Sequence, residues 1–341
     1  MQHVAIDLGG KESQVCVRAA EGQILLERKL ATTSLKKFLQ QQPHSRIVLE
    51  TCAEAFRVAD FALSFEHEVR VVPATLVRTL GVGARRIKTD RRDAQVLSEV
   101  SCRIDLPSVH VPTDIARMRR SMCGMRQELV SSRTALINCV RGWCRTQLLK
   151  SPPSTSRTFP KRIRETALKN ANGLPEYVER LLKMIDVLNE QIALADQELT
   201  QLAEDDPTCK RLMSVPGVGP VTSMRFAAAI DNISRFPTAH AVQSFLDLTP
   251  GENSSSEKQQ RTGITKAGPA PVRHALIQAA WNLRRCRPLD PISQWAAQIE
   301  QRRGKFVATV AVARKLAGIL FAVWRDSSVY QPNHSSRSQP S

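Results

Sequence analysis

The chain has 341 residues, enough for two or three domains, and carries 49 Lys and Arg against 32 Asp and Glu. The resulting net charge of +17 and pI near 10 favour a polyanionic partner, because each neutralised phosphate releases condensed counterions. The apolar run at 307–323 has Arg314 and Lys315 at its centre, which favours a buried or amphipathic helix over a membrane span. We therefore expect a nucleic-acid-binding protein rather than a membrane protein.

The cysteines and the first residues indicate the cellular compartment. The eight cysteines are scattered, without a Cys-x-x-Cys pair or a histidine at zinc-ligand spacing. This pattern disfavours a zinc site and indicates reduced thiols in a cytosolic protein. The opening MQHVAIDLGG reads directly as a strand and a turn, so we expect no signal peptide.

Residues 1–110 predict an α/β domain. Three short β-rich segments predict a meander of three strands: HVAIDLG, QVCVRAA and QILLERKL. A helix at 33–42, the strand RIVLE, a helix from Ala53, the strand EVRVVP, and helices at about 75–82 and 90–103 follow. Three strands followed by alternating helices and strands is the order of an RNase H-like domain.

Four acidic residues of this domain predict a metal site. Asp7 and Glu50 each end a strand, and Asp90 and Asp93 are three apart on one helical face. In an RNase H-like fold these positions converge at one edge of the sheet, where four carboxylates would repel one another without a divalent cation. Mg²⁺ or Mn²⁺ suits all-oxygen ligands and would polarise a phosphodiester. Singly, each acid has a structural alternative, such as a helix N-cap for Asp90 or a solvated strand end for Glu50.

The opening residues also have a second interpretation. IDLGG resembles the phosphate loop of sugar kinases of the actin-like ATPase superfamily, which use a related fold. Those kinases need a second phosphate motif rich in Asp and Gly, and the rest of this chain lacks one. The charge of +17 also suits a nucleic acid better than a sugar.

Residues 111–205 predict a coiled-coil helical arm with a basic loop. Two heptad seams carry this prediction: Ile115, Met118, Met122, Met125, Leu129, Ser132, Leu136, Cys139 and Trp143, then Val178, Leu181, Ile185, Leu188, Ile192, Ala195, Leu199 and Leu202. The first helix is basic and the second largely acidic, which suits pairing. The first helix is either purely structural or also contacts nucleic acid. Between the helices, SPPSTSRTFPKR predicts a basic loop that could order on a polyanion.

The sequence of residues 206–326 predicts a mainly helical domain, and the polar sequence of residues 327–341 predicts a disordered tail. In LMSVPGVGPVTSMRFAAAI the PGVGP turn lies between two apolar helical patterns, as in a helix-hairpin-helix. Gly217 and Gly219 would let backbone N–H groups meet a phosphate of DNA at the start of a helix. The alternative is an ordinary glycine-rich turn between packed helices.

The acidic quartet, the heptad arm and the segment FLDLTPGENSSSEKQQRTGITKAGPAPVRHALIQAAW together resemble the DEDD-type insertion-sequence transposases of the IS110 family, with C-terminal spacing like that of its IS1111 branch. The resemblance covers nearly the whole chain apart from the tail. It implies a RuvC-like metal domain, a C-terminal transposase domain with a catalytic serine, and a bacterial cytoplasmic location. It also implies a homodimer or tetramer, and a structured bridge RNA that guides the choice of target and donor DNA.

The resemblance also indicates which serine would react. Aligning on Pro250 and the following Gly-Ile-Thr-Lys places the nucleophile at Ser255. Ser256 stands where the family has glycine, so Ser254 stays an alternative. We expect four cations around this segment to hold phosphate oxygens: Lys258, Arg261, Lys266 and Arg273.

The expected reaction is DNA cleavage and rejoining at a composite site. Ser255 would attack a phosphodiester with help from the metal site, and the arm would bring one subunit's serine domain to another's metal domain. Two alternatives remain open from the sequence. One is a RuvC-like, metal-dependent junction nuclease without a covalent intermediate, and the other is a nucleic-acid-binding protein without enzymatic activity.

Overall fold

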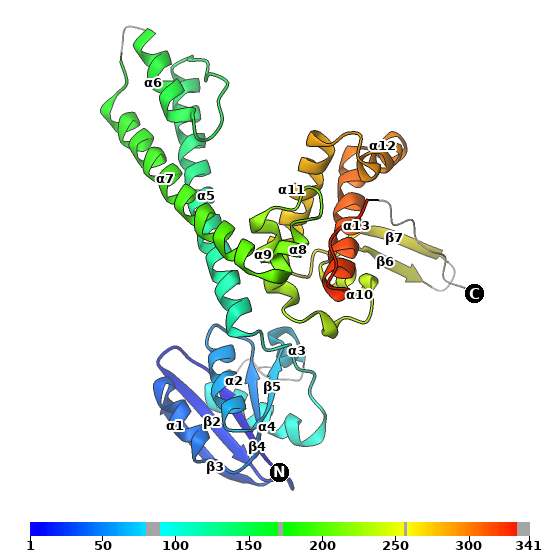
Figure 1. Cartoon of the computed structure of the whole chain (residues 1–341). Helices are drawn as coiled ribbons and strands as arrows, with labels where there is room; N and C mark the ends of the chain where they lie inside the picture. Colours follow the sequence, from blue (N-terminus) through cyan, green and yellow to red (C-terminus); the bar gives the residue numbers. More distant parts are fainter. Residues whose placement is uncertain (80–88, 170–172, 256–257, 333–341) are drawn as a thin grey trace, which may run out of the picture. The chain divides into compact units, whose positions relative to one another are not determined.

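The computed structural model describes residues 1–79, 89–169, 173–255 and 258–332 (Figure 1). For 77–79, 169, 252–255 and 258–262 it describes the backbone only. The chain divides into two compact units, Met1–Pro112 and Thr113–Ser341. The predicted arm and the predicted C-terminal domain thus belong to one unit, where the sequence suggested two.

The first unit is built on a five-stranded sheet in the order β3-β2-β1-β4-β5. Its strands are β1 (Gln2–Asp7), β2 (Glu12–Arg18), β3 (Ile24–Ala31), β4 (Ser45–Glu50) and β5 (Glu68–Val72). Strand β2 is antiparallel to β1 and β3, whereas β1, β4 and β5 are parallel to one another. This mixed sheet is consistent with the predicted RNase H-like domain.

Helices cover both faces of the sheet. The first unit contains η1 (Thr32–Ser34), α1 (Leu35–Gln40), α2 (Ala55–Ser64), α3 (Ala74–Thr79) and α4 (Asp90–Arg103). Val4 and Ile6 of β1 share one core with residues of α1 and α2. Ala5, between them, belongs to a second core with Leu97 of α4, because successive strand residues point to opposite faces. Helix α4 therefore covers the face opposite α1 and α2.

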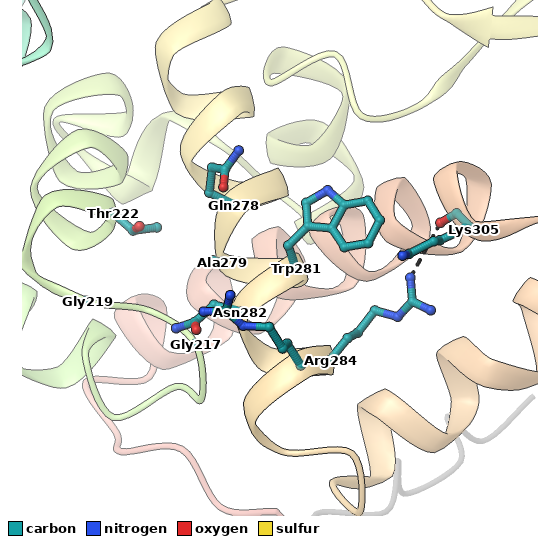
Figure 2. A pocket seen from close by; sticks show the side chains of 10 residues that line it. Gly217, Gly219, Thr222, Gln278, Ala279, Trp281, Asn282, Arg284 and Lys305 are labelled. Atoms are coloured by element: carbon teal, nitrogen blue, oxygen red, sulfur yellow. Dashed lines mark hydrogen bonds between the residues drawn. The ribbon is translucent and has the colours of Figure 1, made fainter. Parts of the chain in front are cut away.

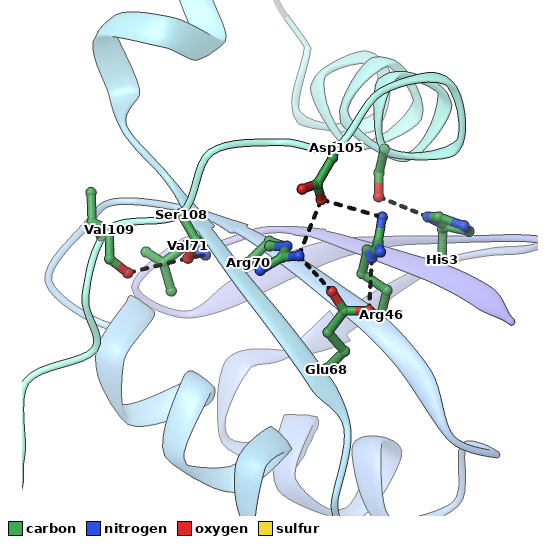
Figure 3. A network of polar contacts seen from close by, with 9 residues as sticks. His3, Arg46, Glu68, Arg70, Val71, Asp105, Ser108 and Val109 are labelled. Atoms are coloured by element: carbon green, nitrogen blue, oxygen red, sulfur yellow. Dashed lines mark hydrogen bonds and ion pairs between the residues drawn. The ribbon is translucent and has the colours of Figure 1, made fainter. Parts of the chain in front are cut away.

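The segment after α4 covers the free edge of β5 (Figure 3). The Val109 N–H donates to the carbonyl of Val71 at 2.8 Å, and the Val71 N–H donates to Ser108 Oγ at 2.9 Å. Ion pairs extend the contact, because Arg70 lies 3.1 Å from Asp105. The edge is thus hydrogen-bonded within the unit rather than open to another strand.

The second unit begins with two long helices that pack against each other, α5 (Asp114–Thr146) and α7 (Glu176–Asp205). Arg126 of α5 lies 2.8 Å from Asp196 of α7, and Arg119 pairs with Asp206 just beyond α7. The opposite charges predicted from the sequence thus meet. The predicted loop is partly wrong, since α6 (Phe159–Lys169) includes its last residues. Phe159 is fully buried in a core shared with α5 and α7, which explains why the end of the predicted loop forms a helix.

The buried face of α5 differs from the predicted seam. Of the predicted seam, Ile115, Met118 and Met125 are exposed, whereas Met122, Leu136 and Trp143 are partly buried against the cores. The fully buried residues of α5 are Ala116, Cys123, Ile137, Val140 and Cys144. On α7 the predicted seam residues Val178, Ile185, Ile192 and Leu199 are buried, together with Leu182 and Ala203, and Leu181 and Leu202 are partly buried against the same cores. Two further helices explain the difference. Helix α9 (Pro220–Ile230) packs against both long helices near Cys123 and Ala203, and Phe159 and Ile163 of α6 share a core with the other end of the pair. Small side chains on α5 and α7 allow the close approach of α9.

The rest of the second unit is mainly helical. It contains α8 (Pro207–Leu212), α9, η2 (Ile233–Arg235), α10 (Ala239–Phe245), a hairpin of β6 (Pro250–Ser255) and β7 (Lys258–Ile264), α11 (Ala270–Cys286), α12 (Pro291–Arg303) and α13 (Lys305–Arg325). Among the described helices, α13 alone is long and apolar enough to cross a membrane, and half of its apolar window is buried in the protein. It packs against α10, α11 and α12. The buried helix predicted at 307–323 is thus a core helix of this unit.

The predicted tail begins in contact with this core. The Tyr330 N–H donates to Ser214 Oγ at 2.8 Å, and its ring packs against buried residues. These first residues of the tail are therefore ordered, and the prediction for 333–341 lies outside the described residues.

The corrected face of α5 can be tested with two alanine variants. Ile137→Ala removes a side chain that is 4% exposed, and we expect a loss of about 2–5 kcal/mol in the free energy of unfolding. Met125→Ala, at a position 71% exposed, should change it by less than about 0.5 kcal/mol. Chemical denaturation measures both. Equal losses would mean that the face is wrongly assigned.

Candidate active site and nucleic-acid interface

Asp7 and Glu50 lie at the same end and on the same face of the sheet. Strands β1 and β4 are parallel neighbours in which Ile6 pairs with Leu49, and each acid is the next and last residue of its strand. By alternation, Asp7 shares a face with Ala5, and Glu50 shares a face with Val48. Both Ala5 and Val48 belong to the core that α4 covers, so the two carboxylates lie on the α4 side.

The first turn of α4 reaches this end of the sheet. His3 Nδ1 near the start of β1 is hydrogen-bonded to Ser101 Oγ near the end of α4 at 2.7 Å, and Ser98 Oγ, one turn earlier, donates to Sγ of Cys16, the residue paired with Ala5. Helix and strand therefore run in opposite directions. The helix rises about 12 Å from Ser101 back to Asp93, and the strand about 13 Å from His3 to Asp7. Asp93 is buried and Asp90, one turn earlier, is exposed. Asp93 thus lies level with Asp7.

Contacts with β3 fix this first turn. Arg91 Nη2 donates to Glu27 Oε2 at 2.5 Å, and Gln95 also donates to Glu27. The hydrogen bond from Arg91 lowers the pKa of Glu27 below its ordinary value, so the carboxylate stays charged at neutral pH. The N-cap is Thr89, whose side chain accepts the Arg92 N–H. Asp90 therefore does not have the capping role that the sequence left open.

The donor type and the common end of the sheet fit a hard divalent cation. Among the described residues, however, no group of three or more His, Cys, Asp or Glu side chains lies close enough together to hold a metal ion. The fold therefore brings the acids to one region of the sheet, but their side chains do not surround a single metal position.

The serine segment is the end of a hairpin rather than a loop. Strands β6 and β7 are antiparallel, with Ser254 paired to Gln259 and Ser255 paired to Lys258. The structure describes only the backbone of these residues and of Arg261, and Ser256 lies outside the described residues. Ser255 is thus the last residue of β6.

A buried ion pair holds the base of this hairpin. Arg273 Nη1 of α11 lies 3.4 Å from Asp247 Oδ2, and the two residues are 9% and 8% exposed. The Thr265 hydroxyl, just after β7, donates to Asp247 Oδ1 at 2.5 Å. Gly268 fits only as glycine, because a Cβ there would lie 2.3 Å from the carbonyl oxygen of Phe245. Both ends of the hairpin are thereby joined to α10 and α11.

This contact corrects one predicted phosphate ligand. Arg273 is buried and paired, so it positions the hairpin instead of holding phosphate oxygens. Lys266 is exposed and has no ion-pair partner among the described residues, which leaves its charge available to a ligand. Its φ of +60° is in the left-handed region, a strained conformation for a side chain of this kind.

The two glycines of the PGVGP turn have different roles. Gly217 has φ +84°, and a Cβ there would lie 2.7 Å from the carbonyl oxygen of Ala279, so it lets the turn pack against α11. Gly219 is the N-cap of α9, and a Cβ there would meet nothing within 4 Å. Both line a cavity of about 710 Å³ with Trp281, Arg284 and further polar residues (Figure 2). The turn is thus closely packed and also faces a basic cavity.

Sequence reasoning missed Asp247 and Trp281. Asp247 stands in an apolar stretch, FLDLTP, where a lone acid is a signal for a buried partner. Trp281 precedes Arg284 and Arg285 by three and four residues, a spacing that places these residues together on a helix.

We expect Asp247→Ala to reduce the free energy of unfolding by about 3–5 kcal/mol, because Arg273 would be left buried without its carboxylate. It should also speed trypsin cleavage after Lys258 and Arg261. Asp326→Ala, which breaks the exposed pair with Arg325, is the control and should cost at most about 1 kcal/mol. Similar stability of the two variants would contradict the role of the buried pair.

Comparisons with known proteins agree with this arrangement. Residues 4–145, which contain all four acids, match the DEDD-type transposase model of IS110 elements. Residues 209–293, which contain the PGVGP turn and the hairpin, match the model of the transposase IS116/IS110/IS902 family.

Full-length relatives show the same similarity. A probable family 20 transposase of Pseudomonas aeruginosa is 27% identical over 97% of this chain and 99% of its own length. The transposase for insertion sequence element IS1111A of Coxiella burnetii is 27% identical over 96% of this chain and 91% of its own. The transposase for insertion sequence element IS1328 of Yersinia enterocolitica is 26% identical over 96% of this chain and 98% of its own length. The two matches and these alignments together show that the chain is a DNA transposase and belongs to the IS110/IS116/IS902 family of insertion-sequence transposases.

Proposed function

We propose that this transposase cuts and rejoins DNA in the bacterial cytoplasm through a covalent serine–phosphate intermediate, assisted by a divalent cation on its carboxylates and guided by an RNA. The observation that carries the proposal is the common position of Asp7, Glu50 and Asp93 at one end and on one face of the sheet. The hairpin that bears Ser255, held at its base by Asp247 and Arg273, supports the covalent step.

The carboxylates would supply the oxygen ligands. Asp7 and Glu50 come from adjacent strand ends and Asp93 from the buried side of α4, with Asp90 one turn away. A bound Mg²⁺ or Mn²⁺ would polarise the phosphodiester and offset charge on its oxygens. Acids held at strand ends and on a packed helix move less than acids on loops, which suits a site that must position a phosphate.

The covalent step exchanges one phosphate ester for another. Ser255 Oγ attacks the phosphorus, an O–P bond forms, and the P–O bond to the departing strand breaks. The serine proton leaves as the departing strand gains its terminal hydroxyl. Attack by the hydroxyl of another strand reverses the step and reseals the DNA, so no ATP is needed. Lys258, Arg261 and Lys266 would hold the phosphate oxygens, because all three belong to β7 or the residues just after it.

The carboxylates can be tested with isosteric variants. We expect Asp7→Asn, Glu50→Gln, Asp90→Asn and Asp93→Asn each to abolish recombination and to weaken Mn²⁺ binding in calorimetry, while circular dichroism stays unchanged. Glu21→Gln, an exposed acid outside this region, is the control and should behave as wild type. Wild-type recombination by both the Asp90 and the Asp93 variant would rule out the metal site.

The nucleophile can be identified with a pair of adjacent variants. Ser255→Ala should keep DNA binding within about tenfold, because one hydroxyl contributes about 1 kcal/mol to such an interface. It should remove the covalent protein–DNA species from a denaturing gel, since no other atom of the chain takes its place. Ser254→Ala should keep that species.

Mass spectrometry of the trapped adduct distinguishes the alternatives. A nucleotide on Ser254 would move the assignment by one residue. Cleavage with free ends and no serine adduct would instead indicate a metal-only junction nuclease, and the absence of any cleavage a binding protein without activity.

The RNA partner and the oligomeric state rest on the family resemblance, on the net charge of +17, and on apolar residues exposed along the arm. These residues are Ile115, Met118, Met125, Tyr177, Met184, Val187 and Leu194. We expect light scattering to show a dimer or tetramer that carries RNA digestible by RNase. A strict monomer with nucleic acid bound, or full activity of nuclease-treated protein on bare DNA, would count against this part of the proposal.

A further inference from the structure

The cavity beside the PGVGP turn has the size and lining of a ligand site. Its volume of about 710 Å³ lies within the roughly 300–1,000 Å³ of small-molecule sites. The turn, the start of α9, α11 and the start of α13 line it (Figure 2). Among the described residues that line it, none is acidic, and Arg284, Arg285 and Lys305 are cationic.

Two of these three cations are uncompensated. Arg284 pairs with Glu300 and donates to Thr309 Oγ1 at 2.8 Å, so its charge is balanced within the protein. Arg285 and Lys305 are exposed and have no ion-pair partner among the described residues. The cavity therefore presents two positive charges to whatever enters it.

One face of α11 combines an aromatic ring with hydrogen-bonding groups. Gln278, Trp281, Asn282 and Arg285 lie at helical spacing and all line the cavity. Lys305 Nζ lies over the Trp281 ring, 4.8 Å from its centroid, and the Arg284 guanidinium carbon lies 5.7 Å from the same centroid. An anion held by Lys305 would therefore lie beside that ring, and Lys305 is exposed, so its side chain can turn from the ring to the anion. The amides of Gln278 and Asn282, one on each side of Trp281 in the sequence, can donate and accept hydrogen bonds.

We propose that this cavity binds one unpaired nucleotide of a nucleic-acid strand. Arg285 and Lys305 hold its phosphate, Trp281 stacks on its base, and Gln278 and Asn282 contact the base edge. Stacking on an aromatic side chain requires an exposed base face, which a paired and stacked base in a duplex does not offer. The inference deepens the proposed function, on which it rests for the presence of a nucleic acid.

Neighbouring residues supply a matched set of variants. Trp281→Leu removes the aromatic face, and Arg285→Ala removes an exposed charge without disturbing the core. Arg287→Ala is the control, because Arg287 is an exposed arginine two residues further on that does not line the cavity. The unfolding transition of each full-length variant shows whether it folds.

Fluorescence anisotropy with three labelled probes tests the proposal: single-stranded DNA, single-stranded RNA of the same sequence, and blunt duplex DNA. Trp281→Leu should raise the Kd for at least one single strand about tenfold and leave the Kd for the duplex unchanged. Arg285→Ala should raise the Kd for that strand several-fold and lower the slope of log K against log salt by about one. Arg287→Ala should change the Kd for single strands and for the duplex by less than about twofold.

The strand that responds, DNA or RNA, identifies the source of the nucleotide. Unchanged single-strand binding by Trp281→Leu and Arg285→Ala would overturn the proposal. Equal losses on single strands and duplex, or equal effects of Arg285→Ala and Arg287→Ala, would also overturn it. The serine adduct is measured independently of strand binding. If the cavity variants bind single strands as wild type does while the protein still forms the adduct, only this inference is rejected.

Discussion

The serine-bearing hairpin depends on the buried pair between Asp247 and Arg273. A two-stranded hairpin is marginally stable in water, and the residues of β6 and β7 are mostly polar, so they offer little apolar surface to bury. Its position must therefore be fixed at its base, where Asp247 meets both Arg273 and Thr265. Asp247 itself has φ +51°, a strained conformation that the surrounding contacts must stabilise. The proposed nucleophile, Ser255 at the end of β6, would take its placement from this one cluster.

The first unit has a corresponding constraint in the parallel pairing of β1 and β4. Because these strands are neighbours and run in the same direction, their last residues, Asp7 and Glu50, lie side by side. This much followed from the sequence, since the order of strands and helices indicates the fold and the acids stand at the strand ends. The contact of Arg91 with Glu27, which fixes the first turn of α4, did not follow, because it joins residues 64 positions apart. Local patterns carry no information on such a partner.

The errors in the second unit share a physical cause. Apolar residues at heptad spacing predicted the seam of α5, but its buried face is set by the helices that pack on it, α9 near Cys123 and α6 and α7 near Ile137 and Cys144. Phe159 looked like part of a polar loop because its burial depends on contacts with the helices before and after it, α5 and α7. The strands β6 and β7 were missed because polar residues such as Gln259 and Gln260 do not alternate with apolar ones. In each case tertiary contact overrode the local pattern.

Tertiary contacts also determine which basic residues are available to a ligand. Some basic residues of this protein pair with carboxylates, and others do not. A net charge of +17 indicates a polyanionic partner but not which cations meet it. Arg126, Arg164 and Arg273 each pair with a carboxylate in the second unit, so their charge is used to hold helices and the hairpin together. Arg285 and Lys305 have no such partner among the described residues, and Lys305 lies over the Trp281 ring. A phosphate binds most favourably to a cation that breaks no ion pair within the protein in order to bind it. The cavity on α11 is therefore a better binding site for a nucleotide than the more basic helix α5.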